Sequence, residues 1–252
     1  FSLNTTSGNG IQSPTNTANG DQSTAIGAYT EASGGASIAM GGFTEASGEF
    51  STSMGSVTEA SGDYSTAMGS YTTASGILST AVGNNTQASD RSSLVIGEYN
   101  LLGSTVTNSA TQFSLENTAF VIGNGTNSNN KSDALTVLFD GTTTIAGDLS
   151  INSDARLKAN IISLGSTLAK LLQIDGKTYT MKKDENKKQK IGVLAQDIEK
   201  VFPELVSESN GVKSVNYQGL VPVLINSLKE QDSKMKEQEA RIERLEKLLL
   251  DS

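Results

Sequence analysis

The stretch from Asp21 to Gly97 repeats itself every 14 residues with almost no slippage of register. Glycine fills one column of the repeat: Gly27, Gly41, Gly55, Gly69, Gly83 and Gly97. The residue before each of these glycines is apolar: Ile26, Met40, Met54, Met68, Val82 and Ile96. Serine recurs from Ser23 to Ser93 and alanine from Ala32 to Ala88 with the same period. A fixed short period makes each copy one structural unit, which must stack on its neighbours to bury its apolar side chains.

Each copy is too short for a pair of helices, and its glycine and serine content disfavours helix interiors. Two short strands and two turns fit, so that one copy forms one coil of a β-solenoid. Each column then becomes a ladder of like side chains about 4.8 Å apart, and six coils give a rod of roughly 25–30 Å. We expect the glycine to form a tight corner and the thin core to hold alanine plus one larger aliphatic residue per copy. Such a rod needs partners along its length, which a trimer would supply.

Several columns that agree in phase, as in "STAMGSYTTASG" at Ser65–Gly76, resemble the 14-residue repeat of the YadA-type head. This resemblance implies a trimeric left-handed parallel β-roll. A low-complexity serine and glycine linker would share the composition but not the phase. We therefore predict a roll over residues 20–99, preceded by a lead-in over residues 1–19 from a longer chain.

The composition excludes several kinds of site. The chain has no cysteine, histidine or tryptophan and a net charge of −8. Disulfides are impossible, and ordinary serine-protease triads and most zinc sites are excluded, so we expect no metal and no cofactor. No apolar run approaches the ~20 residues of a membrane helix, and Phe1 opens no signal peptide, so we expect a soluble chain without membrane insertion.

The parts of the chain before and after Ser153 differ in their balance of acidic and basic residues. Of 19 basic and 27 acidic residues, 2 basic and 12 acidic ones precede it, which leaves 17 basic and 15 acidic residues from Ser153 onward. An acidic first part argues against nucleic-acid binding, which needs clustered lysine and arginine, and leaves neutral or cationic partners open.

Between the repeats and this change in charge, strand signals persist without the period. They are "AFVIGNG", "ALTVLFDG" and "TTTIAGDLSI", separated by glycine, asparagine and aspartate. We interpret residues 100–152 as a β-shaft that joins the roll to the next part; a small independent β-domain is the alternative.

Three motifs follow Asn152: "SDARLKANI" from Ser153, "IGVLAQDIEKVFPELV" from Ile191 and "VNYQGLVPVLINSLKEQ" from Val215. Together they resemble the intramolecular chaperone of endosialidase-type tail spikes, the peptidase S74 family. The resemblance implies that residues 153–222 form a module that trimerises, guides folding of the fibre ahead of it and then cuts itself off. The implied cut lies between Asn152 and Ser153, and this single self-cleavage is the only chemistry expected.

By matching positions, the resemblance makes Ser153 the nucleophile and Lys158 its general base, with Asp154, Arg156 and Gln196 as candidate supporting residues. A lysine accepts a proton only when neutral, so Lys158 needs a pKa lowered by burial or by a nearby cation, for which Arg156 is the candidate. Positions five apart on a helix point about 140° apart, so this stretch should be bent or partly extended.

Alternatives remain open for this site. Ser153 or Asp154 could be a helix N-cap with Lys158 a solvated charge, and Gln196 a buried structural amide. Asn152 could cyclise onto its own carbonyl and break the same bond. The chain also departs from the family: Lys190 and Ile191 stand where some members carry histidine, and Asp197 where glutamate is frequent, while we assign the "FPEL" run with Pro203 to a helix end.

Apolar residues near the C-terminus fall into heptads that predict a coiled coil over residues 223–252. One core position holds Val221, Leu228, Met235, Ile242 and Leu249, and the other holds Leu224, Gln231, Gln238 and Leu245. A trimer agrees with the two resemblances, and a single helix docked on the chaperone is the alternative.

The sequence therefore predicts a mainly β chain followed by a small α+β domain: the C-terminal part of a homotrimeric tail fibre or adhesin with a glycan or protein receptor. We expect it on a virion tail fibre or a bacterial cell surface. The alternatives are a trimeric autotransporter passenger, against which the charged C-terminal helix argues, and the stalk of a glycan-degrading spike, for which no paired carboxylates are placed. The threonine column from Thr30 to Thr86 also suggests an ice-binding surface, although alanine fills the neighbouring column.

Overall fold

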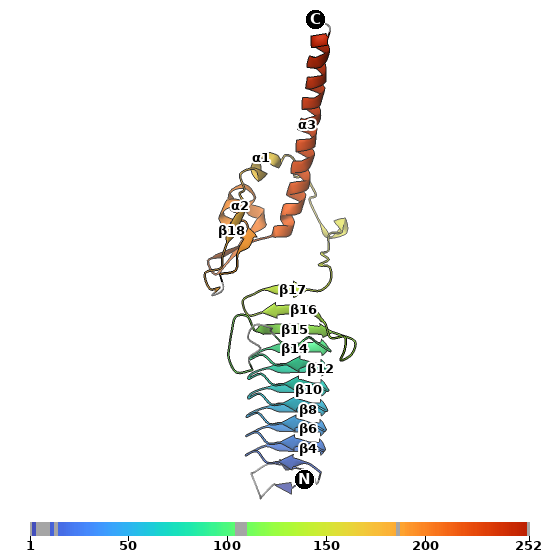
Figure 1. Cartoon of the computed structure of the whole chain (residues 1–252), viewed down its shortest axis with the longest axis vertical. Helices are drawn as coiled ribbons and strands as arrows, with labels where there is room; N and C mark the ends of the chain where they lie inside the picture. Colours follow the sequence, from blue (N-terminus) through green and yellow to red (C-terminus); the bar gives the residue numbers. More distant parts are fainter. Residues whose placement is uncertain (1, 4–10, 13–14, 104–109, 185–186, 251–252) are drawn as a thin grey trace. The chain divides into compact units, whose positions relative to one another are not determined.

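The computed structural model describes residues 2–3, 11–12, 15–103, 110–184 and 187–250. Contacts divide the chain into two compact units, Phe1–Asn152 and Ser153–Ser252. The first unit is a stack of β-strands, and the second contains short elements and one long helix (Figure 1).

Each 14-residue copy forms one five-residue strand and one two-residue strand. The five-residue strands pair in parallel, in the order β4 (Thr24–Ala28), β6 (Ile38–Gly42), β8 (Thr52–Ser56), β10 (Thr66–Ser70), β12 (Thr80–Asn84) and β14 (Leu94–Glu98). The two-residue strands form a second parallel sheet of β3 (Thr17–Ala18), β5 (Glu31–Ala32), β7 (Glu45–Ala46), β9 (Glu59–Ala60), β11 (Thr73–Ala74) and β13 (Gln87–Ala88). Every residue faces its equivalent in the next copy, as Met54 faces Met68. The predicted β-solenoid of about six coils, which we call the roll, is confirmed.

The sheet of long strands extends beyond the repeats at both ends (Figure 1). The N-terminal strands β1 (Ser2–Leu3) and β2 (Ile11–Gln12) are antiparallel, and β2 joins β4. At the other end β15 (Thr118–Asn124) pairs in parallel with β14, followed by the antiparallel strands β16 (Asp133–Leu138) and β17 (Thr143–Ile145). The sheet therefore continues after the last copy of the repeat.

The core of the roll consists of alanine ladders closed by inward-facing serine and threonine. Ala25, Ala32 and most of their equivalents are fully buried. The larger aliphatic residues, from Ile26 to Ile96, lie half-buried or exposed on the outer face of the long strands, so our expectation that they fill the core was wrong. Side chains alternate between the two faces of a strand, so a residue next to an inward alanine points outward.

The glycine column does not form the corners, which corrects a second expectation. These glycines lie inside the long strands with φ between +100° and +136°, and a Cβ added to Gly41 would come within 2.0 Å of the Gly55 carbonyl oxygen. The corners are made by other residues with positive φ, such as Tyr29 (55°) and Ala36 (51°). Glycine is required because successive coils approach one another too closely for a side chain.

The threonine column faces the interior. Thr30, Thr44, Thr58, Thr72 and Thr86 are at most 2% exposed. A flat, exposed threonine array is therefore absent from this column, and the ice-binding alternative is excluded.

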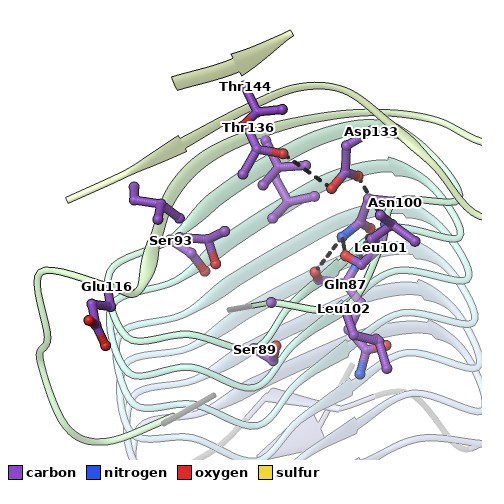
Figure 2. Close-up of a pocket in the computed structure, with 15 residues that line it drawn as sticks. Gln87, Ser89, Ser93, Asn100, Leu101, Leu102, Glu116, Asp133, Thr136 and Thr144 are labelled. Atoms are coloured by element: carbon purple, nitrogen blue, oxygen red, sulfur yellow. Dashed lines mark hydrogen bonds between the residues drawn. The ribbon is translucent and has the colours of Figure 1, made fainter. Parts of the chain in front are cut away.

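An asparagine side chain closes the last coil. The Asn100 Oδ1 atom accepts a hydrogen bond from the Gln87 amide (2.7 Å), and its Nδ2 atom donates one to the Gln87 carbonyl (3.0 Å) (Figure 2). Nearby, the Asp133 carboxylate accepts from the Leu101 amide (2.9 Å) and burial raises its pKa. These side chains replace the backbone partners that a further coil would supply.

The second unit is built around one small core. The helix α2 (Ala195–Val201) and the start of α3 (Leu220–Leu250) contribute Ile198, Val201 and Val223, and Phe202 fills the space between them. The remaining elements are α1 (Leu168–Leu171), the antiparallel pairs β18 (Lys177–Tyr179) with β19 (Lys190–Gly192) and β20 (Val206–Ser209) with β21 (Val212–Val215), and the 3-10 helices η1 (Ala155–Leu157), η2 (Pro203–Leu205) and η3 (Tyr217–Gly219).

The long helix α3 has few buried residues within its own chain. Only Val223 and Ser227 are buried among its described residues, while Leu228 and Met235, at a predicted core position of the coiled coil, are 72% and 52% exposed. In the part of the chain that the structure covers, no helix combines the length and apolar character needed to cross a membrane.

Candidate active site

The stretch that begins at Ser153 is bent, as the five-residue spacing requires. Asp154 and Lys158 are both extended, with ψ of 134° and 146°, and the single turn of η1 lies between them. The Asp154 carboxylate caps this turn by accepting from the Arg156 amide at 2.9 Å. Lys158 is thereby directed back toward the first residue of the unit.

This bend brings Lys158 into contact with Ser153. The Lys158 Nζ atom donates a hydrogen bond to the Ser153 Oγ atom at 2.7 Å. Both residues are exposed within the single chain. The structure thus joins the two residues that the family resemblance implied as nucleophile and base, at the distance over which a proton can be transferred.

Arg156 is engaged by Asp154. The Arg156 guanidinium donates to both Asp154 oxygens, with Nη2–Oδ2 at 2.6 Å and Nε at 3.1 Å from each oxygen. Hydrogen bonds from the Arg156 side chain and amide lower the pKa of Asp154, and the same side-chain bonds raise the pKa of Arg156. This ion pair offsets part of the charge of Arg156, and the role of Arg156 as the cation beside Lys158 stays a prediction.

Gln196 lies apart from this contact. It is exposed on α2, which overturns the alternative of a buried structural amide, and no hydrogen bond joins it to Ser153 or Lys158 among the described residues. Asp197, on the same helix, binds Lys200 at 2.8 Å, and this hydrogen bond lowers its pKa.

Sequence reasoning missed a clamp formed by Glu230. Its carboxylate accepts from the Ser166 hydroxyl (2.8 Å) and from the amides of Thr167 and Leu168 at the start of α1. The buried Thr167 side chain also contacts Ser227 (2.9 Å) on α3. The clamp fixes the segment that follows the Ser153–Lys158 pair to the long helix, and more than 60 residues separate its two sides, so no local sequence signal could reveal it.

Exposed apolar residues flank Lys158 on both sides in the sequence. Leu157, Ile161 and Ile162 are 71%, 67% and 87% exposed. Exposed apolar residues that adjoin in this way are typical of a surface that another molecule covers.

Comparison with known proteins agrees with both resemblances. The family model for the YadA head domain repeat matches stretches between residues 14 and 97, and the model for the chaperone of endosialidase matches residues 153–207. One part of the chain is thus similar to YadA head repeats, and a later part is similar to the chaperone of endosialidase. The chaperone match begins at Ser153, the first residue of the second compact unit.

Two similar proteins are long tail fibre proteins of bacteriophages. The chain is 32% identical over 110 residues to the long tail fiber protein Gp37 of Salmonella phage S16, and 31% identical over 91 residues to that of Escherichia phage AR1. These alignments cover 36% and 32% of this chain but only 15% and 8% of the relatives. The chain therefore corresponds to a small part of either relative.

Proposed function

We propose that this chain is part of a homotrimeric phage tail fibre whose C-terminal unit brings three chains together, assists folding of the roll and removes itself by cleavage between Asn152 and Ser153. The observation that carries the proposal is the 2.7 Å contact between the Lys158 Nζ and Ser153 Oγ atoms at the start of the second unit. The chaperone and tail-fibre relatives support the fibre context and a location on the virion.

The proposed chemistry needs only these two side chains and water. Neutral Lys158 takes the Ser153 hydroxyl proton while the Oγ atom attacks the Asn152 carbonyl carbon. The C–N bond then breaks, the Ser153 nitrogen receives the proton from Lys158, and the amide becomes an ester. Water hydrolyses the ester, which leaves a carboxylate on Asn152 and restores the hydroxyl and free amine of Ser153.

The exposed position of Lys158 suggests when this reaction occurs. A lysine in water is protonated at neutral pH and cannot act as a base, whereas burial lowers the pKa of a lysine. The exposed segment with Leu157, Ile161 and Ile162 adjoins Lys158, so packing of a second chain against it would remove water from the pair. Cleavage would then follow assembly.

Two unpartnered apolar surfaces support assembly of identical chains. The outer face of the long strands presents an aliphatic column from Ile26 to Ile96, and α3 presents a stripe of Leu228, Met235 and Ile242. Heptad stripes of this kind associate as coiled coils. A repeat with a fixed column of apolar residues offers the same surface at every coil, which suits parallel association in register.

The decisive experiment measures intact and native mass of the wild type, Ser153→Ala and Lys158→Arg. We expect the wild type to yield a fragment that ends at Asn152, and both variants to remain whole yet trimeric, because arginine keeps the charge but cannot be deprotonated. Cleavage that persists in Ser153→Ala would point to cyclisation of Asn152. A monomeric wild type would refute the assembly part of the proposal.

The dependence on assembly has its own test. Wild-type chain that is still whole, isolated in urea from inclusion bodies, is diluted into buffer at several protein concentrations, and the cleaved fraction is followed by gel electrophoresis. We expect cleavage to slow as the chain is diluted, because three chains must meet first. A rate independent of concentration would show that one chain completes the site alone.

A further inference from the structure

One corner of the roll carries a ladder of exposed side chains. Each of its residues has positive φ, and the ladder runs Tyr29, Phe43, Val57, Tyr71, Asn85 and Tyr99. Tyr29 and Phe43 are 64% and 61% exposed, and their rings stack with centroids 5.0 Å apart and an angle of 14° between planes. Val57 interrupts the aromatic ladder at the next coil, and Tyr71 (58% exposed) resumes it.

The interruption leaves a slot between two aromatic rings. Coils lie about 4.8 Å apart, so Phe43 and Tyr71, two coils apart, are separated by roughly 9–10 Å. Val57 is too short to fill this space and forms its floor. The hollow is completed by residues of the short-strand face and the next corner: Glu45, Thr58, Glu59, Thr73 and Asn85.

The coil beneath the slot departs from the repeat in two ways. Val57 is β-branched yet has φ of 55°, a conformation that costs such residues about 1–3 kcal/mol. Inside the same coil Ser53 replaces the alanine of the core ladder, and its Oγ atom donates to the Thr58 carbonyl (2.9 Å) and contacts the Thr58 Oγ1 atom (2.7 Å). The strained corner is therefore held from within by a hydrogen bond specific to this coil.

The wall of the slot is negatively charged. Glu31, Glu45 and Glu59 face one another in register along the short strands. Burial, and then the carboxylates of Glu59 and Glu31, raise the pKa of Glu45. No lysine or arginine pairs with these carboxylates within the described ranges, and Arg91 instead donates to the Thr111 carbonyl (3.0 Å). A cation in the slot would relieve this repulsion.

We propose that the slot between Phe43 and Tyr71 binds an alkylammonium group. A group midway between the rings lies roughly 5 Å from each, within the ~6 Å range of cation–π attraction. A flat guanidinium would contact only one ring, because flat groups pack at about 3.5–4.0 Å, whereas a tetrahedral ammonium spans the space. Glu45 and Glu59 supply the opposite charge. The slot lies at the corner and beside the short strands, apart from the aliphatic column of the long strands that we propose to be covered in the trimer, and it does not involve the self-cleavage site.

The test uses small probes of matched shape on the full-length chain. Binding of choline, of its neutral isostere 3,3-dimethyl-1-butanol and of methyl glucoside is measured by saturation-transfer NMR. We expect saturable choline binding that is at least tenfold tighter than binding of the neutral isostere. Nα-acetyl-lysine methylamide distinguishes the sources of the group: tighter binding than choline indicates a lysine of a protein partner, and weaker binding indicates a quaternary ammonium ligand.

Variants connect the binding to the slot. Val57→Phe should abolish choline binding because it fills the slot and continues the ladder, while circular dichroism stays unchanged. Tyr71→Ala should weaken binding about three- to tenfold, as expected for the loss of ~0.7–1.4 kcal/mol of cation–π attraction. The control is Tyr64→Ala, since that ring stacks on Phe50 at the other corner, where the next coil carries Leu78.

Several results would overturn the proposal. Equal binding of choline and its neutral isostere would show that charge plays no part, and tighter binding of methyl glucoside would identify a saccharide site. Choline binding that survives Val57→Phe would locate it elsewhere. Absence of choline binding to the wild type would mean that the slot is closed, as a contact between chains would close it. Fragment masses are recorded on the same samples, so failure of the cleavage proposal is seen separately.

Discussion

Adjacent glycines in β6 provide a sharp test of how closely the coils of the roll approach. At Gly41, with φ of +128°, an added Cβ atom would lie 2.0 Å from the Gly55 carbonyl oxygen and 2.9 Å from its carbonyl carbon. At Gly42 an added Cβ atom would meet nothing within 4 Å. The equivalents of Gly42 already carry side chains, including Ala28 and Ser56. Gly41→Ala and Gly42→Ala are therefore a matched pair.

The expected cost of Gly41→Ala follows from this geometry. Restoring ordinary contact at 3.4 Å requires the coils to separate locally by about 1.4 Å, which lengthens the ladder hydrogen bonds beyond about 4 Å. Loss of two or three such bonds costs about 1 kcal/mol each, and the unfavourable φ adds about 1–3 kcal/mol. The free energy of unfolding should fall by about 3–6 kcal/mol per chain. Gly42→Ala should leave it unchanged or raise it by up to about 1 kcal/mol.

Thermal unfolding followed by far-ultraviolet circular dichroism measures this difference. For a unit of this size, 1 kcal/mol corresponds to about 2–4 °C, so Gly41→Ala should unfold at least about 6 °C below Gly42→Ala. Both variants are heated at one scan rate, because assembled fibres can unfold irreversibly. Equal unfolding temperatures would refute the close approach of coils described here.

Further predictions concern the second unit. Ile198→Ala should destabilise it by about 2–5 kcal/mol, measured by chemical unfolding, because Ile198 is fully buried, and an unchanged midpoint would contradict the core described. The hydrogen bonds from Ser166 and then from the Thr167 amide lower the pKa of Glu230, so the clamp contributes stability above the ordinary glutamate pKa and loses it as the pH falls through the lowered value. Glu230→Gln should thus reduce both the stability at pH 7 and its decline on acidification, and equal pH profiles would contradict the clamp. Leu228→Glu should reduce the trimer fraction in native mass spectra, whereas Ser233→Glu, on the opposite side of α3, should not.

The phase of the repeat was sufficient to predict the register of the roll, because identical columns must pair when one copy forms one coil. The role of glycine could not be read in the same way. A positive φ serves both a corner and a close approach, and the sequence does not distinguish them. The strand β15 was recognised as a strand but not as a continuation of the sheet. Its "FVIG" run at Phe120 matches "LVIG" at Leu94, and the inserted loop obscures the shared phase.

For the candidate site, local spacing predicted what lies within a few residues. The bend between Ser153 and Lys158 follows from the positions of two side chains that have to meet. The pairing of Arg156 with Asp154 was not predicted, because Arg156 lies two residues from Asp154 and two residues from Lys158, so spacing does not choose between them. The Glu230 clamp joins α1 to α3 through tertiary packing. No repeat or local motif in the sequence indicates this contact.

The contrast between the two units is consistent with the role in assembly that we propose for the second one. A single coil buries little more than its alanines and several serine and threonine hydroxyls that have no partner among the described residues, so an isolated coil gains little free energy. Its hydrogen bonds form only when the next coil is in place, which makes the first coils costly and the later ones favourable. The second unit has its own core around Ile198 and Phe202, and it can fold before the roll does. In the proposed trimer it would hold three chains in register during the costly first steps. After its removal the roll should persist through kinetic stability, because chains that unfold have lost the module that assembled them.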